Sequence, residues 1–526
     1  MGKVSLLFNT VKHLKVKQII YQVAYRVFKI KPLAAYKSSL PIKQPQFLSF
    51  SDFLPDATYA TENGEFLFLN QKVSFKEKID WDYMGNGKLW NYNLHYANYL
   101  LQEGIPLATK LTWLSDLHNA LYSSNKGLEP YPVSLRIMNT IRLISRHKLN
   151  VTDILDALAA EVNFLSGRVE YHLLGNHVLE NGFALLMGGA FFQKENWIER
   201  GHEILKKELK EQILSDGAHF ELSPMYHQII LYRVLELIDW YSNWTGGNRN
   251  QLNFYRATAS NMLSWLDQMT FRNGDIPHFN DSANGITYTS SELSAYAGHL
   301  NIKPEQHLSL DESGYRKFST DKYECVVDVA AVGPTYQPGH AHSDALAFIL
   351  YVHDTPLLVE RGTSTYQPDK QRAFERSTAA HNTVTLNNHN QSEVWGGFRV
   401  GDRAVVNVLT DEDSRLEAEH DGYMKFGVIC KRSFIFEKNK LTIKDSFRGK
   451  LGAADSLFAY FHLHPEVNFV KEDDTTYYAN GTEMKFSGAT DLSIDKYEFS
   501  EGFNKRREGQ VICVKFLNTL ETIISF

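Results

Sequence analysis

Hydrophobic residues change their spacing partway along the chain. From about Trp81 to Leu300 they recur with the period of an amphipathic helix, which predicts helices over 107–123, 135–146, 154–165 and 226–244. Farther on they form alternating, β-branched runs, which predict strands over 323–332, 345–352, 383–386, 428–436 and 511–516. Asn480-Gly481 lies between two such runs and predicts a tight hairpin. Segregated helices and strands indicate separate domains rather than a parallel α/β sheet.

The N-terminal segment differs from the rest in charge. No Asp or Glu precedes Asp52, whereas nine Lys and Arg lie between Lys3 and Lys43. Apolar residues recur there at helical spacing, at Val4, Leu7, Val11, Leu14, Val16, Ile20, Val23, Val27 and Ile30. Two interpretations stay open, peripheral contact with a membrane surface and packing on the body of the protein with a solvated basic face. Lysines interrupt the apolar run, so we expect no cleaved signal peptide, and a cytoplasmic or membrane-peripheral location is favoured over a periplasmic one.

Charge and composition narrow the function classes. The chain has 526 residues, enough for two large domains, and a formal net charge of -6 that argues against a nucleic-acid partner. Its three cysteines are too scattered for a disulfide framework and are expected to be buried thiols. Phosphate-cradling, dinucleotide-binding and serine-hydrolase motifs are absent from the sequence, so no organic cofactor is expected. The oligomeric state cannot be read from the sequence.

Two polar clusters interrupt the helical region. The first, 175–182, precedes an apolar run, so Asn176 is predicted to cap a helix, while His177 and Glu180 share one face and the carboxylate can orient the imidazole. In the second, 216–227, Ser223 is a candidate N-cap with Pro224 at the first helical position. Tyr226 then lies in the first turn, where the helix dipole favours a phenolate.

A third polar cluster begins the strand region. If 340–342 is a strand, His340 and His342 point to the same face. An acid and a third histidine on neighbouring strands would complete a metal site, and zinc suits such ligands best. A hydrogen-bonded histidine network without metal is the alternative.

These three clusters, in this order, resemble the heparinase II/III family of polysaccharide lyases. The resemblance extends to the aromatic segment 90–96 with Tyr99, to Leu135-Arg136-Ile137, to 339–344 and to 380–383. It implies an α+β multidomain fold in which an incomplete (α/α) toroid is followed by an antiparallel β-sandwich. The expected regions are a basic amphipathic segment (1–50), the catalytic toroid (51–310) and the β-sandwich (311–526).

The resemblance also implies roles for individual residues. Asn176 and His177 face the substrate carboxylate with Glu180 in support, Tyr226 transfers protons, and His340 is the second catalytic histidine. His342, Glu360 and His381 resemble the ligands of a structural zinc ion. Further candidates for substrate binding are Trp90, Asn93, His95, Arg136, Glu221, His227 and Tyr366. The sequence departs from the family pattern twice, with Glu360 where Asp is expected and Asn280 where Gly is expected before Asp281.

The chemistry expected from this set is β-elimination on an acidic, uronate-containing polysaccharide. It requires neutralisation of the uronate carboxylate, a base for the adjacent proton and an acid for the leaving oxygen, with either Tyr226 or a histidine as the base. One alternative is a toroid glycoside hydrolase with two carboxylates drawn from Glu180, Glu221, Asp275 and Asp281. Another is a non-catalytic glycan-binding protein of a polysaccharide-assembly system.

Overall fold

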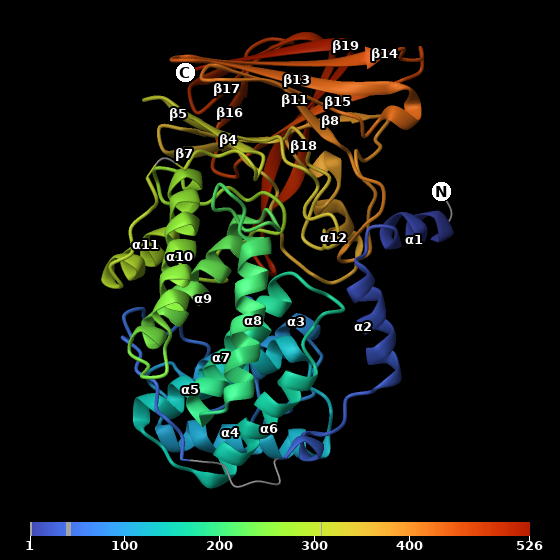
Figure 1. Cartoon of the computed structure of the whole chain (residues 1–526). Coiled ribbons are helices and arrows are strands. Elements are labelled where there is room, and N and C mark those ends of the chain that lie inside the picture. The colour runs from blue at the N-terminus through green and yellow to red at the C-terminus, as the bar shows by residue number, and fades with distance from the viewer. Residues whose placement is uncertain (1–2, 38–43, 307) are drawn as a thin grey trace.

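A computed structural model describes residues 3–37, 44–306 and 308–526. Helices form the lower body and β-strands cover its upper end (Figure 1). The helices are α1 (Lys3–Val11), α2 (Val16–Val27), α3 (Lys88–Tyr96), α4 (Leu107–Ser123), α5 (Pro130–His147), α6 (Thr152–Gly167), α7 (Asn176–Phe192), α8 (Glu195–Gln212), α9 (Pro224–Ser242), α10 (Arg249–Met269), α11 (Ser290–His299) and α12 (Lys370–Glu375). Short 3-10 turns are η1 (Leu33–Tyr36), η2 (Asn98–Leu100), η3 (Thr378–Ala380) and η4 (Met424–Phe426).

The predicted helices are present, and their bounds follow local signals. The prediction for 107–123 matches α4 residue for residue, whereas α5 starts earlier than predicted, at Pro130. Proline is tolerated in a first helical turn because its missing N–H has no partner there anyway. A small antiparallel sheet, β1 (Ala60–Thr61), β2 (Glu65–Phe68) and β3 (Gln71–Ser74), precedes α3 and was not predicted.

The C-terminal part is one large antiparallel assembly of strands. Its strands are β4 (Tyr315–Ser319), β5 (Tyr323–Asp328), β6 (Phe348–Val352), β7 (Thr355–Leu358), β8 (Val384–Leu386), β11 (Val406–Glu412), β12 (Arg415–His420), β13 (Val428–Glu437), β14 (Lys440–Gly449), β15 (Leu457–Leu463), β16 (Phe469–Lys471), β17 (Thr476–Ala479), β18 (Thr482–Gly502) and β19 (Lys505–Ser525). Strands β9 (Val394–Trp395) and β10 (Arg399–Val400) form a separate pair. The predicted hairpin is confirmed, since Asn480 and Gly481 join β17 to β18.

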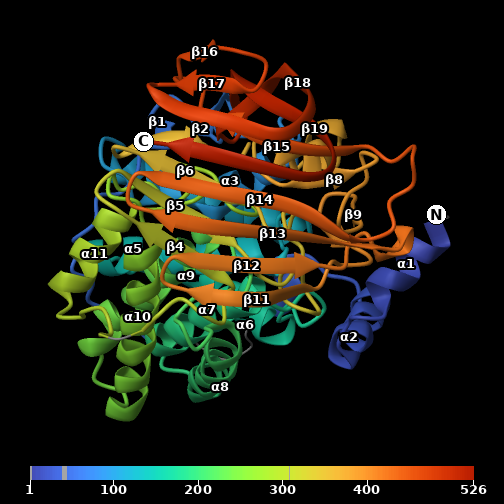
Figure 2. The ribbon, with the colours of Figure 1, turned by 90° about the horizontal axis from the view of Figure 1, so that it is seen from above.

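The large sheet curls so that its two ends pack on each other. Its main path runs β11-β12-β13-β14-β19-β15-β7-β6-β5-β4, which places β4 far from β13 along the sheet. Yet Phe318 of β4 stacks on Phe436 of β13 with ring centroids 3.6 Å apart, and Phe348 of β6 contacts Phe434. Figure 2 shows the layered strands from above. Helices followed by a two-layered antiparallel sheet confirm the predicted fold class.

The two halves are joined by a buried apolar interface. Trp265 and Met269 of α10 pack in one cluster with Tyr315, Val326 and Ile349 of the sheet. The last helix before the sheet ends at His299 and the first strand begins at Tyr315. A loop of the helical half meets a loop of the sheet half where the Asp281 N–H donates to the His340 carbonyl at 3.1 Å.

The N-terminal helices run along the side of both halves (Figure 1). The α1 residue Asn9 donates to Glu393 at 3.2 Å, and Tyr25 of α2 donates to the Val169 carbonyl at 2.7 Å. In the described part of the chain, none of the helices is both long and apolar enough to cross a membrane. The three cysteines are buried free thiols, as predicted.

Candidate active site

The first part of the site is the start of α7. Asn176 is the first helical residue and makes no side-chain cap, so the predicted cap is wrong, and Gly175 occupies the N-cap position. Gly175 has a φ of 62°, and a Cβ there would lie 2.6 Å from Glu221 Oε1. Both the backbone conformation and the close approach therefore require glycine. The Asn176 backbone N–H donates to that same Oε1 at 3.0 Å, while the Asn176 Oδ1 atom is buried without a partner.

His177 is oriented by a different carboxylate from the one predicted. Its Nδ1 lies 3.1 Å from Glu170 Oε2, and its ring packs against Tyr131 with centroids 4.7 Å apart. Glu180 instead pairs with Arg233 Nε at 3.1 Å, because the buried guanidinium on α9 offers it a stronger partner. Burial lowers the pKa of His177, but the Glu170 carboxylate outweighs this and leaves the pKa raised. Glu170 is thus the supporting residue, and Glu180 acts on His177 only at longer range.

The start of α9 positions Tyr226 as predicted. Ser223 is the N-cap, its hydroxyl accepts the Tyr226 N–H at 3.2 Å, and Pro224 is the first helical residue. The predicted shift toward phenolate is wrong for the protein alone. Burial raises the pKa of Tyr226 well above its usual value, and the neighbouring Tyr366 adds to the rise. The desolvation cost of a buried phenolate exceeds the effect of the helix dipole, so Tyr226 is protonated.

His340 and His342 lie in the loop between β5 and β6, so the predicted strand does not extend over them. The His340 ring lies against the Tyr226 ring with centroids 4.0 Å apart. Its Nε2 is 3.6 Å from Glu221 Oε2, and Tyr226 Oη is 3.2 Å from Tyr366 Oη. Asn176, Glu221, Tyr226, His340 and Tyr366 therefore form one contiguous cluster.

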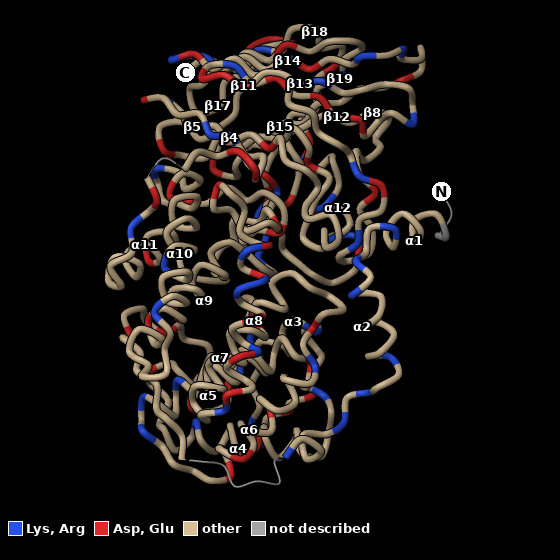
Figure 3. The backbone as a smooth tube through the Cα atoms, viewed as in Figure 1, with Lys and Arg blue, Asp and Glu red and all other residues tan. Residues whose placement is uncertain are grey.

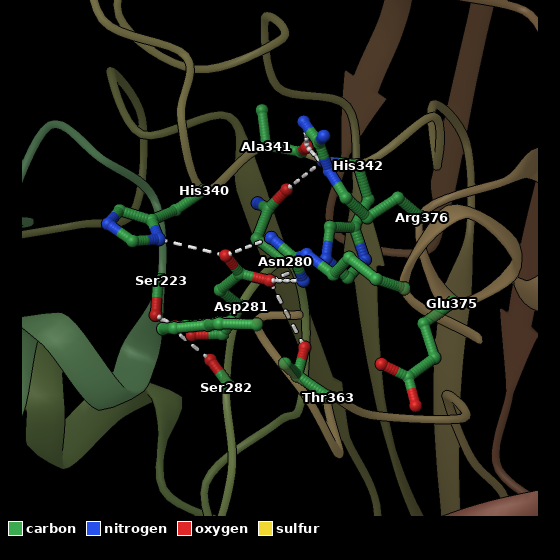
Figure 4. Close-up of polar contacts among 12 residues, drawn as sticks. Ser223, Asn280, Asp281, Ser282, His340, Ala341, His342, Thr363, Glu375 and Arg376 are labelled. Atoms are coloured by element: carbon green, nitrogen blue, oxygen red, sulfur yellow. Dashed lines mark hydrogen bonds and ion pairs between the residues drawn. The ribbon is translucent and has the colours of Figure 1, made fainter. Parts of the chain in front are cut away.

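Asp281 joins His340 to His342. Its Oδ2 accepts from His340 Nδ1 at 2.8 Å, and its Oδ1 accepts from His342 Nε2 at 2.9 Å (Figure 4). The Arg372 guanidinium of α12 donates to both Asp281 carboxylate oxygens, with Nη2 2.6 Å from Oδ2. The Thr363 hydroxyl donates to Asp281 Oδ1 at 3.2 Å. Burial alone would raise the pKa of Asp281, but Arg372 holds it well below the usual range. An ionised carboxylate only accepts, so both imidazoles must present N–H to it, which fixes their tautomers.

Asn280 explains one departure from the family pattern. Its φ is 55°, a left-handed conformation that glycine adopts freely and that asparagine tolerates better than most residues. Its amide donates to the Leu222 carbonyl and to Tyr315, and its Oδ1 accepts the His342 N–H at 2.9 Å. Asparagine therefore replaces glycine here without loss of the turn, and it adds contacts that position His342.

A group of three buried side chains could bind a metal ion. Candidate ligand atoms of His342, Asp344 and His381 all lie within 4.8 Å of one another. His342 Nδ1, Asp344 Oδ2 and His381 Nε2 are each buried without a hydrogen-bond partner. Two of the predicted ligands are in this group, but Asp344 takes the place predicted for Glu360. The Glu360 carboxylate instead bonds His381 Nδ1, so its longer side chain supports a ligand from behind.

Several predicted substrate-binding residues are structural. Trp90 is fully buried and donates to the Gln71 carbonyl, and Arg136 is fully buried in an ion pair with Glu161 at 2.6 Å. His95 and His227 bond the carbonyls of Trp81 and Met262 inside the core, where burial lowers their pKa to about 4 and about 3. In the structure these four side chains belong to the core rather than to an exposed groove, because each satisfies its polar atoms within the helical body. Asn93 bonds the Leu89 carbonyl in its own helix, whereas Glu221 and Tyr366 lie in the cluster.

Sequence reasoning missed the roles of Glu170, Asp281, Asp344 and Arg372. The sequence marks Asp281 as a candidate hydrolase carboxylate and as part of the family pattern, but nothing near it points to Arg372, which lies 91 residues away. Asp344 carried a signal, because it follows His342 in the same polar segment.

The site combines three side chains that are useful in acid–base chemistry. Tyr226 is protonated, the tautomer of the His340 imidazole is fixed by Asp281, and the pKa of His177 is raised.

Solved structures share this architecture of a helical body followed by a curled antiparallel β-sheet domain. A crystal structure of heparinase III superimposes with a TM-score of 0.70 at 17% identity, covering 96% of this chain and 89% of that one. A chondroitin AC lyase from Streptomyces coelicolor A3, in complex with chondroitin sulphate, gives 0.52 at 10% identity, covering 82% and 74%. At these identities the likeness shows the fold alone.

The sequence comparisons identify the family. The profile described as heparinase II/III N-terminus matches residues 148–308, and that described as heparinase II/III-like, C-terminal matches 302–526. The chain therefore belongs to the heparinase II/III family. It is 28% identical over 355 residues to a heparin-sulfate lyase of Bacteroides stercoris, covering 60% of this chain and 50% of that protein. A heparin-sulfate lyase of Pedobacter heparinus is 25% identical over 274 residues, covering 45% and 40%. The chain thus spans about half the length of the curated relatives it matches, or less.

Proposed function

We propose that this protein is a polysaccharide lyase that cleaves a uronate-containing polysaccharide by β-elimination and leaves an unsaturated uronate end. The observation that carries the proposal is the contact between Tyr226 and His340, with Asn176 and Glu221 beside them. Family membership supports the same reaction.

Neutralisation of the uronate carboxylate falls to Asn176 and His177. The raised pKa of His177 favours its cationic form, which pairs with a carboxylate and stabilises the negative charge that develops when the adjacent carbon loses its proton. Rotation of the Asn176 amide would let it donate to the same group. One such hydrogen-bond donor typically lowers the free energy of the transition state by about 3 kcal/mol when the site is preorganised.

Proton transfer falls to His340 and Tyr226. Asp281 occupies His340 Nδ1, so the Nε2 lone pair is free to accept the proton from the carbon next to the carboxylate. A carbon–carbon double bond then forms as the bond to the glycosidic oxygen breaks. The protonated Tyr226 donates its hydroxyl proton to that leaving oxygen. This assignment makes the histidine the base and the tyrosine the acid.

Hydrolysis fits the same residues poorly. A hydrolase needs one carboxylic acid that is protonated and one carboxylate, both facing the scissile bond. Asp281 is held ionised by Arg372, Glu180 is paired with Arg233, and Asp275 accepts a hydrogen bond from the Tyr351 hydroxyl at 3.1 Å. Of the four candidates, Glu221 and Asp281 contact His340, and Arg372 holds the pKa of Asp281 well below its usual range.

The substrate class proposed is the glycosaminoglycans, because the curated relatives are named heparin-sulfate lyases. The test is ultraviolet absorbance of the conjugated product when purified protein meets heparan sulfate, chondroitin sulfate, hyaluronan and alginate. Rising absorbance on a uronate polymer supports the proposal. Saturated reducing ends without absorbance would indicate hydrolysis, and binding without any product would indicate a glycan-binding protein.

We further propose that His342, Asp344 and His381 hold a structural zinc ion. Two imidazole nitrogens and a carboxylate oxygen are a donor set that zinc accepts, and their unpartnered atoms are otherwise costly in a buried site. Such an ion would tie the loop before β6 to the segment before β8. Elemental analysis of the purified protein and its thermal unfolding with and without chelator test this. A protein without zinc whose melting ignores chelator would refute it.

A further inference from the structure

The outer face of the N-terminal helices is unusually apolar. Exposed large hydrophobic residues in the described part of the chain number 26, and nine of them lie between residues 7 and 28. On α2 the side chains of Val16, Ile20, Val23 and Val27 are 57–72% exposed and follow helical spacing, so they form one stripe. Phe28, 71% exposed, continues the stripe, and Leu7, Phe8 and Val11 extend it onto α1.

The inward face of α2 is polar, which reverses the usual arrangement of a surface helix. Gln18 is its one fully buried residue and donates to the carbonyls of Leu173 and Tyr336. Tyr25 donates to the Val169 carbonyl, and the Tyr21 ring packs on Tyr171. The helix is therefore fixed to the body through polar and aromatic contacts, while its apolar stripe is directed away from the core. Figures 1 and 2 both place α1 and α2 at the edge of the molecule, with no other labelled element outside them.

The helices that carry this stripe hold charges of a single sign, because they contain Lys and Arg but no Asp or Glu. Lys12 and Lys15 pair with Asp402 and Glu211 of the body, but Arg26, Lys29 and Lys31 make no ion pair among the described residues. Arg168 adds another cation beside Phe28, to whose carbonyl it donates. Figure 3 shows blue and no red positions along α1 and α2. An apolar stripe beside unpaired cations complements an anionic lipid surface, where side chains enter the acyl boundary and cations meet headgroups.

We propose that α1 and α2 dock this protein on an anionic membrane surface, with the stripe of Val16, Ile20, Val23, Val27 and Phe28 inserted in the interface. Charge favours this occupant over a second copy of the chain, since pairing two copies of this segment would bring cations together without anions between them.

The test is cosedimentation of the full chain with phosphatidylcholine vesicles that contain or lack phosphatidylglycerol. We expect binding to the anionic vesicles that weakens as salt is added. The variant Ile20→Ser/Val23→Ser/Val27→Ser should lower the partition coefficient about tenfold or more, because it removes most of the inserted apolar surface. Arg26→Gln/Lys29→Gln should weaken binding to anionic vesicles severalfold.

A matched control is Val470→Ser/Leu517→Ser, which removes side chains of 63% and 57% exposure from the β-sheet domain. It should bind vesicles as the wild type does, and circular dichroism melting should show all variants folded. Failure of the wild type to sediment with anionic vesicles at low salt would overturn the proposal, as would equal binding by the triple serine variant. A dimer in light scattering that this variant abolishes, without vesicle binding, would assign the face to a second copy instead.

Discussion

The two imidazoles that share Asp281 stand in different surroundings, although one residue separates them in the chain. His340 lies against Tyr226, with Tyr366 and Phe398 nearby, and its Nε2 lies 3.6 Å from Glu221 Oε2. His342 is 1% exposed, and its free Nδ1 belongs to the group with Asp344 and His381. Asp281 binds opposite nitrogens of the two rings. One carboxylate thus leaves Nε2 available on one ring and Nδ1 on the other, and our proposal gives proton transfer to His340 and metal binding to His342.

Replacing each histidine in turn gives the largest expected difference. His340→Ala should reduce kcat by roughly 10²–10⁴-fold, because the base is lost, while metal content and melting temperature stay near those of the wild type. His342→Ala should remove the metal and lower the melting temperature. Steady-state kinetics, elemental analysis and thermal melting measure these quantities. Loss of metal in His340→Ala, or full metal content in His342→Ala, would contradict the division of roles.

Asp281→Asn should impair both functions together. The substitution leaves the Arg372 guanidinium buried without its counterion, which typically costs about 3–5 kcal/mol of unfolding free energy. The substitution also removes the carboxylate that fixes the tautomers of His340 and His342. Activity and metal affinity should therefore fall in the same variant. Denaturant unfolding, kinetics and metal titration provide the readouts.

A milder change at the same carboxylate serves as the control. Thr363→Val removes one neutral donor to Asp281 and should cost only about 0.5–1.5 kcal/mol, with activity largely retained. If Asp281→Asn behaved like Thr363→Val, the carboxylate would not be the link between the two histidines.

The pH dependence should depend on Glu170. Its carboxylate raises the pKa of His177 above the ordinary 6.5, so the cation is fully present below pH 6.5 and is lost as pH rises through the raised value. The alkaline limb of kcat/KM should follow that loss, and Glu170→Gln should move this limb to lower pH. The contribution of the His177–Glu170 ion pair to the free energy of unfolding is lost over the same pH range, as pH rises through the raised pKa of His177. A profile that Glu170→Gln leaves unmoved would show that His177 does not act as a cation.

The smallest effect is expected at Asn93. Its side chain bonds the carbonyl of Leu89 one turn earlier in α3, so Asn93→Ala should change both kcat/KM and melting temperature little. A marked rise in KM would instead support the prediction from the sequence that Asn93 binds substrate.

Local signals predicted much of the fold. Ser223 and Pro224 define the start of α9, and Asn480-Gly481 defines a hairpin, because capping and turn chemistry act within a few residues. Asn176, Tyr226 and His340 stand in polar segments that the sequence singles out, and the family resemblance, rather than any local signal, groups them into one candidate site. Local signals do not predict whether a side chain points into the site or into the core. Trp90 and Arg136 have the chemistry of groove residues and are buried in the helical body.

The partners of the site residues could not be predicted because they come from distant segments. Arg372 reaches Asp281 across 91 positions, and nothing near either residue indicates the pair. His177 has Glu180 on its own helical face, but Glu180 binds Arg233, which leaves Glu170 as its partner. The partner of His177 therefore depends on which buried charges compete for Glu180, and the tertiary fold determines which charges those are.

The most direct test of the account is ultraviolet monitoring of uronate polymers with the wild type and with Tyr226→Phe. We expect rising absorbance from the wild type on at least one glycosaminoglycan and a loss of roughly 10²–10⁴-fold in Tyr226→Phe, which keeps the ring on His340 but removes the donated proton. Melting temperatures of the two proteins should be close. Undiminished product formation by Tyr226→Phe, or products without the conjugated double bond, would contradict elimination through this site.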